Sequence, residues 1–455
     1  MEEQGGREQW GSRIGFILAA IGSAVGLGNI WRFPYLTAKS GGASFVLLYI
    51  ILLFIIGMPV MVAEFIIGRG GQKSPVQSMA QEDEPNWSVL GLLFVFTGFW
   101  ILSYYSVVAG WAMKYTIDSI TMNLMQVNPP EFFGQISSGT TALFYHFLFM
   151  AITTVIVTMG VKKGIESCVK VLIPLLFVMI IGLGVWAFTQ PGSAGGYSFY
   201  LEPDFSKMIA TYYVAGIPIT FLNLNLLANA AGQTFFTLSL GMGAMITYAS
   251  YLSKDEDLAE ETTIIALSNF GIAFLSGLMV FPIISAFNLF DSIKESTVAT
   301  LFMAVPKAFQ EIGGIMGGML SAVFFTCLFL AALTSAISLL EVVTSASIDQ
   351  LPINRRGATV MNGTLIFVFG VLPASNTDIL SLMDTMATNL LLMSGGLLLA
   401  IYVGWLMKSA TEEFRKGLKF DLVVPWKLLI RFVIPPVLLA LLIQGVYTLF
   451  TTLAK

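Results

Sequence analysis

Two apolar segments contain clusters of glycine where a helix would otherwise cross a membrane. The first runs Gly22-Ser-Ala-Val-Gly26-Leu-Gly28-Asn29, and the second runs Thr237-Leu-Ser239-Leu-Gly241-Met-Gly243. A helix broken inside such a segment leaves backbone N–H groups free on one half and carbonyl groups free on the other. These ends favour an anion and a cation, respectively. The two segments therefore predict a site that holds a carboxylate beside a sodium ion.

Close packing of helices is the alternative reading of these glycines. Small residues four apart, such as Gly22 and Gly26, are common where membrane helices touch. Two features favour a binding site instead: Arg32 and Pro34 follow within the same apolar segment, and the breaks fall in the first and sixth predicted helices. Interrupted helices at corresponding places in two halves are typical of inverted-repeat transporters.

The sequence carries no recognisable catalytic motif. Its single histidine, His146, excludes an HExxH zinc site, and we find neither a GxSxG elbow nor a phosphate-binding loop. His146, Cys168 and Cys327 are expected to have structural roles. The pattern therefore argues against an enzyme.

The composition is that of a membrane protein. Of 455 residues, 56% are apolar and 11% charged, and the mean hydropathy is +0.82, whereas a soluble chain carries about 25% charged residues. The net charge of −4 and the lack of a basic stripe argue against nucleic acid as a partner. Crossing a bilayer takes about 20 apolar residues. The apolar runs predict about eleven spans, at 13–36, 43–68, 88–120, 142–160, 164–188, 230–252, 262–288, 316–348, 358–373, 379–405 and 429–452.

Lysine and arginine predict the orientation in the cell membrane. The loops on one side hold Arg7, Arg13, Arg69, Lys73, Lys162, Lys163, Lys254, Arg355, Arg356, Lys408, Arg415, Lys416 and Lys419, whereas the alternate loops 121–141 and 374–378 hold no Lys or Arg. The positive-inside rule then puts the N-terminus in the cytoplasm and the C-terminus outside. The uncharged stretch 208–230 would reverse the later loops if it were a further span. We expect an extracellular or re-entrant helix there, because Pro218 and two asparagines do not suit a lipid-facing helix.

Two longer motifs carry a family resemblance. The segments GSAVGLGNIWRFPY and GQTFFTLSLGMGAMITYASY, with LAALTSAIS at 330–338, resemble the prokaryotic branch of the neurotransmitter:sodium symporter family. The resemblance extends from Arg7 to the last span. It implies an all-α polytopic membrane protein, with about eleven transmembrane helices, a 5+5 inverted repeat and discontinuous helices 1 and 6. The chain would be one transporter domain, 1–455, with a first repeat at 12–188, a second at 230–405 and an additional helix at 429–452.

The resemblance implies two sodium sites made of neutral oxygens. The first would be completed by the substrate carboxylate and would use the Ala24 carbonyl, Asn29, Thr237 and Asn269. The second would use the carbonyls of Gly22, Val25 and Ala331 and the hydroxyls of Thr334 and Ser335. Because the carboxylate would complete the first site, ion and substrate would raise each other's affinity equally.

An amino acid substrate is implied beside the first sodium ion. Its carboxylate would meet the Leu27 and Gly28 amides and the Tyr105 hydroxyl, near Ala24 and Thr237. Related monoamine transporters have an aspartate where this chain has Gly26, so the glycine favours a substrate with its own carboxylate. The rest of the pocket would be Ile101, Tyr105, Phe236, Ser239, Met242, Ser335 and Leu339. This lining is mostly apolar and favours a small hydrophobic or aromatic L-amino acid.

Charged residues near the ends of spans are implied to form two gates. An ionisable residue inside an apolar span costs about 2.5 to 3.5 kcal/mol and usually marks function. By resemblance, Arg32 and Asp384 form an extracellular gate above Phe236. The intracellular gate would consist of Arg7 and Asp349 near Tyr251.

Other positions differ from the family pattern or leave its function open. Gly164 and Pro174 match a pattern for unwinding helix five toward the second sodium site. Tyr49, Gln233, Thr237 and Asn269 match positions around a chloride site, but Ala273 replaces the expected serine or acid, so chloride dependence stays open.

The function implied is sodium-coupled import of an amino acid by alternating access across the lipid bilayer. An amino acid sensor on the same fold, and a uniporter or proton-coupled relative, remain alternatives. A relative without sodium coupling would be expected to lose the hydroxyls of Thr334 and Ser335. Neither the exact amino acid nor the oligomeric state follows from the sequence.

Overall fold

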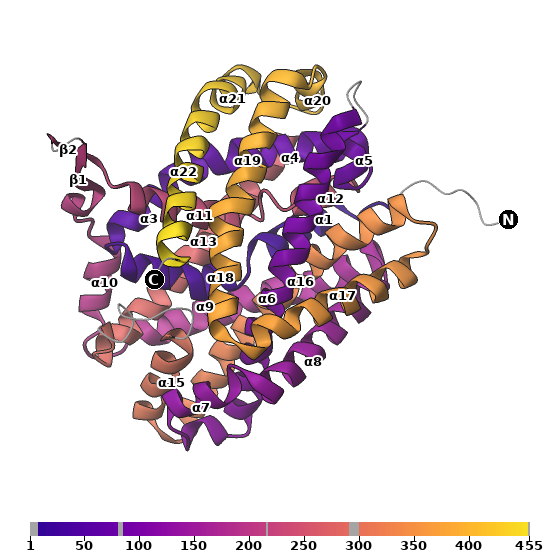
Figure 1. Cartoon of the computed structure of the whole chain (residues 1–455). Coiled ribbons are helices and arrows are strands. Elements are labelled where there is room, and N and C mark those ends of the chain that lie inside the picture. Colours follow the sequence, from indigo (N-terminus) through magenta and orange to yellow (C-terminus); the bar gives the residue numbers. More distant parts are fainter. Residues whose placement is uncertain (1–7, 81–84, 215–216, 291–299, 454–455) are drawn as a thin grey trace.

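The apolar runs form long helices in the computed structural model, which describes residues 8–80, 85–214, 217–290 and 300–453 (Figure 1). Within these residues, nine helical segments are long and apolar enough to cross a membrane. A tenth is the pair Arg13–Ala24 and Gly28–Lys39, which is bent by 47°. The predicted fold class, an all-α polytopic membrane protein, is confirmed.

The predicted spans correspond to single or composite helices whose ends differ from the prediction by a few residues. They are α1, η1 and α2 (Arg13–Ala24, Gly28–Arg32, Phe33–Lys39); α3, η2 and α4 (Ala43–Leu52, Leu53–Gly57, Met58–Gly71); α6 (Ser88–Ile120); α8 (Gly139–Thr158); η5 and α9 (Val161–Glu166, Ser167–Phe188); α11 and α12 (Leu224–Thr237, Ala244–Ala249); α13 (Leu258–Ala286); α16 (Gly314–Gln350); α17 (Arg355–Ser375); α18, η7, α19 and η8 (Thr377–Met386, Ala387–Leu391, Leu392–Ile401, Tyr402–Leu406); and α21, η9 and α22 (Val423–Leu428, Leu429–Val433, Ile434–Leu453).

Short elements connect the spans. They are α5 (Pro75–Met79), η3 (Pro85–Trp87), η4 (Asn123–Met125), α7 (Pro129–Ile136), α10 (Ala194–Leu201), η6 (Phe205–Met208), strands β1 (Ile209–Val214) and β2 (Ile217–Leu222), α15 (Thr300–Ile312) and α20 (Ala410–Arg415).

Polar side chains start many of the helices. Ser12, Asn223, Asp257, Asn354 and Asn376 each precede a helix and accept a hydrogen bond from an amide of its first turn. Such caps satisfy amides that have no partner within the helix. They fix where the apolar runs begin as helices.

The longest helices form the centre of the bundle. α16 packs along α6, and both contact α8 and α17. The first half of the broken first span, α1, packs against α16, α9 and α13. Outer helices keep an apolar face toward the lipid: on α9, Val178 is 68% exposed while Ile180 is buried. The breaks are therefore held inside a scaffold of continuous helices.

The prediction of a helix at 208–230 is wrong. Residues 209–214 and 217–222 form two antiparallel strands in which Ile209 pairs with Leu222 and Val214 with Ile217. The β-branched and aromatic residues of this stretch favour a strand. The helix begins only at Leu224, capped by Asn223, and it is the first half of the sixth span, which the sequence placed at 230. The expectation that the stretch is not a further lipid-crossing helix agrees with this structure.

Candidate functional site

The first span is interrupted after Ala24. Val25 is extended, with φ −89° and ψ 104°, and the chain resumes as a π-helix at Gly28. The Leu27 amide donates to the Tyr105 hydroxyl of α6 at 3.0 Å. The Leu27 amide, which follows the break, therefore faces α6.

The second break separates α11 from α12 and is bonded to the first. Ser239, Gly241 and Gly243 have φ values of 53°, 74° and 75°. Glycine adopts such values readily, but serine does so at a cost, and strained backbone is concentrated at functional sites. The Ser239 hydroxyl donates to the Ser23 carbonyl at 2.8 Å. The two interrupted helices thus meet at their breaks.

A small cavity of about 20 Å³ lies between the breaks. Most of the predicted substrate residues line it, namely Ala24, Gly28, Ile101, Tyr105, Phe236, Ser239, Met242, Ser335 and Leu339. Ser23 and Gly26 complete the lining, whereas Leu27 and Thr237 of the predicted set are outside it. A cavity of this volume holds about one water molecule. Side chains must therefore move when an amino acid enters.

One group of oxygens gathers around α16. The Ser335 hydroxyl lies 3.3 Å from the Gly22 carbonyl and 3.3 Å from the Val25 carbonyl. The Thr334 hydroxyl lies 3.4 Å from the Val25 carbonyl and 3.0 Å from that of Ala331. All five groups predicted for the second sodium site are thus brought together. They are neutral, hard oxygens, which suit a hard cation.

A second group surrounds Asn269 of α13. One atom of its side-chain amide lies 3.1 Å from both the Ala24 and the Thr237 carbonyl oxygens. The same atom lies 2.7 Å from the Asn29 side-chain nitrogen. If the amide nitrogen occupies this position, it donates to both carbonyls. If the amide oxygen occupies it, that oxygen faces the two carbonyl oxygens, and a cation between them would stabilise the arrangement. The four residues predicted for the first sodium site therefore converge.

Arg32 and Asp384 close the end of the site that faces away from the N-terminus. The Arg32 guanidinium lies 5.0 Å from the Phe236 ring centre, and its Nε is 4.0 Å from the Asp384 carboxylate. Arg32 also donates to Gln233 at 3.0 Å, and the Tyr104 hydroxyl donates to Asp384 at 3.1 Å. The pair thus lies over a side chain that lines the cavity, as the resemblance implied.

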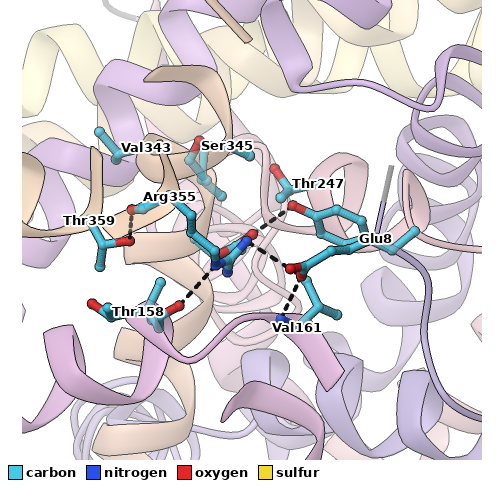
Figure 2. A network of polar contacts seen from close by, with 12 residues as sticks. Glu8, Thr158, Val161, Thr247, Val343, Ser345, Arg355 and Thr359 are labelled. Atoms are coloured by element: carbon cyan, nitrogen blue, oxygen red, sulfur yellow. Dashed lines mark hydrogen bonds and ion pairs between the residues drawn. The ribbon is translucent and has the colours of Figure 1, made fainter. Parts of the chain in front are cut away.

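A charged network closes the opposite end, near the N-terminal segment (Figure 2). Arg355 forms a 2.5 Å ion pair with the fully buried Glu341 and a 3.6 Å pair with Glu8. The Tyr251 hydroxyl donates to Glu341 at 2.6 Å, and Glu8 accepts from the Val161 amide at 2.8 Å. The network joins the N-terminal segment to α16, α17 and the end of α12.

Most of this network was not predicted from the sequence. The predicted gate consisted of Arg7 and Asp349 near Tyr251, and Arg7 lies outside the described residues. Asp349 accepts from the Ser74 amide at 2.6 Å. The available signal for Glu341 was a carboxylate inside the apolar run 316–348, which usually marks function. A cavity of about 420 Å³ lies beside the network, lined by Glu8, Gln72, Lys73, Tyr251, Ser345, Ile348, Asp349 and Arg355.

Glu64 is a further residue that the sequence analysis did not single out. It lies within the predicted span 43–68, and its side chain is fully buried. Its carboxylate accepts from the Gly241 amide at 2.7 Å. Glu64 thus holds the non-helical segment between α11 and α12 against α4.

The residues of the hinge pattern lie in helix five, and the residues of the chloride pattern lie around Thr237. Gly164 lies in the π-helical first turn η5, and Pro174 lies within α9, so helix five is wound between them. Tyr49 contacts the Thr237 hydroxyl at 3.0 Å, and Gln233 donates to the Gly28 carbonyl at 2.7 Å. Ala273 is buried without a polar group to add to this cluster.

Known proteins resemble this chain over nearly its whole length. The model of the sodium:neurotransmitter symporter family matches residues 7–129 and 134–454. An uncharacterized sodium-dependent transporter of Haemophilus influenzae is 31% identical over 469 residues, covering 97% of this chain and 98% of the relative. A second, from Methanocaldococcus jannaschii, is 33% identical over 467 residues, covering 98% and 92%.

A solved structure agrees with the sequence relatives. The crystal structure of MhsT in complex with L-phenylalanine has a TM-score of 0.86 to this structure and is 37% identical, covering 97% of this chain and 100% of MhsT. These relatives are transporters rather than enzymes. The chain therefore belongs to the sodium:neurotransmitter symporter family and is a sodium-dependent transporter of the membrane.

Proposed function

We propose that the protein imports a small hydrophobic or aromatic L-amino acid together with sodium, by alternating access. The observation that carries this proposal is the cavity between the two helix breaks. Its lining is mostly apolar and has no charged side chain, while the Leu27 amide and the Tyr105 hydroxyl, hydrogen-bonded to each other, lie at one edge. A carboxylate suits that edge, and an apolar side chain suits the rest. The L-phenylalanine bound to MhsT supports the same class of substrate.

Sodium is assigned to the two oxygen groups, one around Asn269 and one around Thr334 and Ser335. The substrate carboxylate would complete the first group, which lies next to the cavity. Binding of each would then strengthen binding of the other by the same factor. The sodium gradient and the membrane potential would supply the work, about 2.3 kcal/mol per charge for every 100 mV. Chloride is not assigned, because Ala273 adds no polar group.

The two closures are assigned to the two sides of the membrane. At the N-terminal end of the bundle, acidic side chains form ion pairs with Arg13, Arg69 and Lys419. The basic loops are therefore gathered at that end. By the positive-inside rule that end is cytoplasmic, and the C-terminus is extracellular. The Arg355 network would then be the inner gate and the Arg32–Asp384 pair the outer one. The repeats 12–188 and 230–405 would supply the broken helices.

Uptake by purified protein in liposomes tests the proposal. A panel of labelled amino acids is added outside vesicles with an inward sodium gradient, and then with potassium or choline replacing sodium. We expect sodium-dependent accumulation of hydrophobic or aromatic amino acids, with little uptake of acidic and basic ones. The Thr334→Ala, Ser335→Ala double variant, which is expected to need more sodium, is the control for sodium coupling.

Each alternative gives a different result. Sodium-dependent binding without accumulation would indicate a sensor and contradict transport. Accumulation that persists without sodium would contradict the assignment of sodium to these oxygen groups. Preferred uptake of a charged amino acid would contradict the apolar pocket while leaving the coupling intact.

A further inference from the structure

The β-hairpin between α10 and α11 has no evident role in transport, and its chemistry is unusual for an exposed loop. Residues 208–253 contain no charged side chain. On the hairpin, Ile209 is 54% exposed, Ile219 43%, Phe221 41% and Leu222 36%. Side chains alternate between the faces of a strand, so Ile219 and Phe221 share one face and Ile209 and Leu222 the other. Both faces of the hairpin are therefore apolar.

The hairpin leads into a helix that contacts a membrane-crossing span. Gln444 donates to Asn225, in the first turn of α11, at 3.0 Å. Gln444 lies within the span Val423–Leu449. Asn225 is three residues beyond the end of β2, so the base of the hairpin lies close to the last turns of that span. In Figure 1 the two strands project outward from the side of the bundle, past α3 and α10. The hairpin therefore lies at the side of the bundle, where lipid surrounds a membrane-spanning protein.

The backbone limits how deeply the hairpin lies in the lipid. In the described part of the chain, β1 and β2 pair only with each other, so each strand has an open outer edge. Unpaired N–H and C=O groups in hydrocarbon cost several kcal/mol each, roughly. At the headgroup level these groups meet water and lipid oxygens. Tyrosine is enriched at that level, and Tyr212 packs on Phe221 with ring centres 4.7 Å apart.

The hairpin is bonded to the start of the broken sixth helix. The Leu224 amide donates to the Tyr212 hydroxyl at 2.7 Å, and the Asn223 amide donates to the Met208 carbonyl at 2.8 Å. The other end of that helix, α11, carries Phe236 of the cavity. The hairpin is therefore connected through hydrogen bonds to a helix that lines the site.

We propose that the hairpin is a lipid anchor, which lies in the headgroup region of the bilayer and ties the start of α11 to it. In the orientation proposed above this is the outer leaflet. The exposed cation Lys207 precedes the strands and faces the anionic phosphates. The proposal does not depend on which amino acid is carried or on how many sodium ions accompany it.

Site-specific quenching in liposomes tests the anchor. Ile219→Cys is made in a background without the two free cysteines, by Cys168→Ala and Cys327→Ala, and it is labelled with an environment-sensitive fluorophore. Val178→Cys on the lipid-facing side of α9 is the lipid control, and Gln135→Cys on exposed α7 is the water control. Quenching is measured with iodide in the buffer and with lipids that carry a nitroxide near the headgroup or near the chain end.

The anchor predicts that the nitroxide near the headgroup quenches the Ile219 probe severalfold more than the one near the chain end. Iodide should quench it severalfold less than the Gln135 probe. Equal iodide quenching at both positions would overturn the proposal. Protection from iodide that disappears when the protein is diluted in lipid would overturn it in favour of a second copy of the chain. Ile209→Cys, on the other strand, repeats the test if labelling at Ile219 disturbs the hairpin.

Discussion

The Tyr105 hydroxyl and the Leu27 amide are hydrogen-bonded at 3.0 Å across the first helix break. One group comes from the continuous helix α6 and the other from the backbone freed between α1 and η1. The bond holds both within reach of a single carboxylate, so the half-helix and the scaffold would act on the substrate together. In the proposed function, this pair would link substrate binding to the geometry of the broken helix.

Tyr105→Phe should weaken amino acid binding and leave the fold intact. Hydrogen bonds to charged groups contribute about 1.5–3 kcal/mol, which corresponds to a roughly 10- to 100-fold change in the dissociation constant. Sodium-dependent binding of a labelled amino acid measures this change. Tyr115→Phe is the matched control, because Tyr115 is buried in the same helix and donates to the Phe302 carbonyl at 2.8 Å, away from the cavity. Equal effects of the two substitutions would contradict the carboxylate role.

Gly26→Ala should weaken amino acid binding. A methyl group at Gly26 would collide with the Ser335 hydroxyl and lie 2.6 Å from the Tyr105 hydroxyl. Overpacking costs about 1–3 kcal/mol, and here it would fall on two groups of the site, so we expect affinity to drop by about tenfold or more. Gly26→Asp should be worse, because its carboxylate would repel that of the substrate. Equilibrium binding with purified protein measures both.

Gly232→Ala is the control for the substitutions of Gly26. It lies in α11, and nothing lies within 4 Å of a methyl group built there. Alanine is favoured over glycine in a helix by about 0.5–1 kcal/mol. We therefore expect unchanged affinity and an equal or higher thermal midpoint. Loss of binding in this variant would mean that glycines of the broken helices are needed for movement rather than for space.

The helix breaks could be predicted from the sequence because the residues that mark them are close together in the chain. Clusters of glycine within an apolar run, and the neutral oxygen donors around them, can be read without knowing the fold. The residues that the resemblance placed around the cavity and the two oxygen groups do converge in space. Most helix ends were also predicted to within a few residues, since polar caps and charged loops mark them.

The network around Arg355 and Glu341 could not be predicted in the same way. Its members come from the N-terminal segment, the turn after α12, α16 and α17, and each is an ordinary charge or hydroxyl in its own segment. Only the packing of the helices brings them together. The hairpin was not predicted for a different reason. An apolar, uncharged run is compatible with a helix as well as with a strand, and here the β-branched and aromatic residues favour the strand.

Thr334→Ala with Ser335→Ala should raise the sodium concentration needed for half-maximal binding. The two hydroxyls face the carbonyls of Gly22 and Val25 at 3.3–3.4 Å. Without them, a cation would lose two of its five proposed ligands, so we expect at least tenfold weaker sodium activation, about 1.4 kcal/mol. A sodium titration of amino acid binding measures it. Ser321→Ala, on the same helix and bonded to Ser119 at 2.8 Å, is the control. Unchanged sodium dependence in the double variant would contradict the second site.

Arg355→Ala should open the N-terminal end of the site. Glu341 is fully buried, and Arg355 is its ion-pair partner at 2.5 Å. Removing one partner of a buried pair costs about 3–5 kcal/mol, because a charge is left uncompensated. Conformers that admit water to Glu341 should then become dominant, and net transport should fall.

Modification of Ser345→Cys reports this opening. Ser345 is buried and lines the cavity beside the network, so a thiol there should react faster with a water-soluble reagent when Arg355 is replaced. Arg355→Met combined with Glu341→Met should slow the reaction again, since no buried charge is then left unpaired. Lys419→Ala breaks the exposed pair with Glu260 at the same end and should leave the rate unchanged. If the reaction rate did not respond to Arg355→Ala, the network would be a structural contact and not a gate.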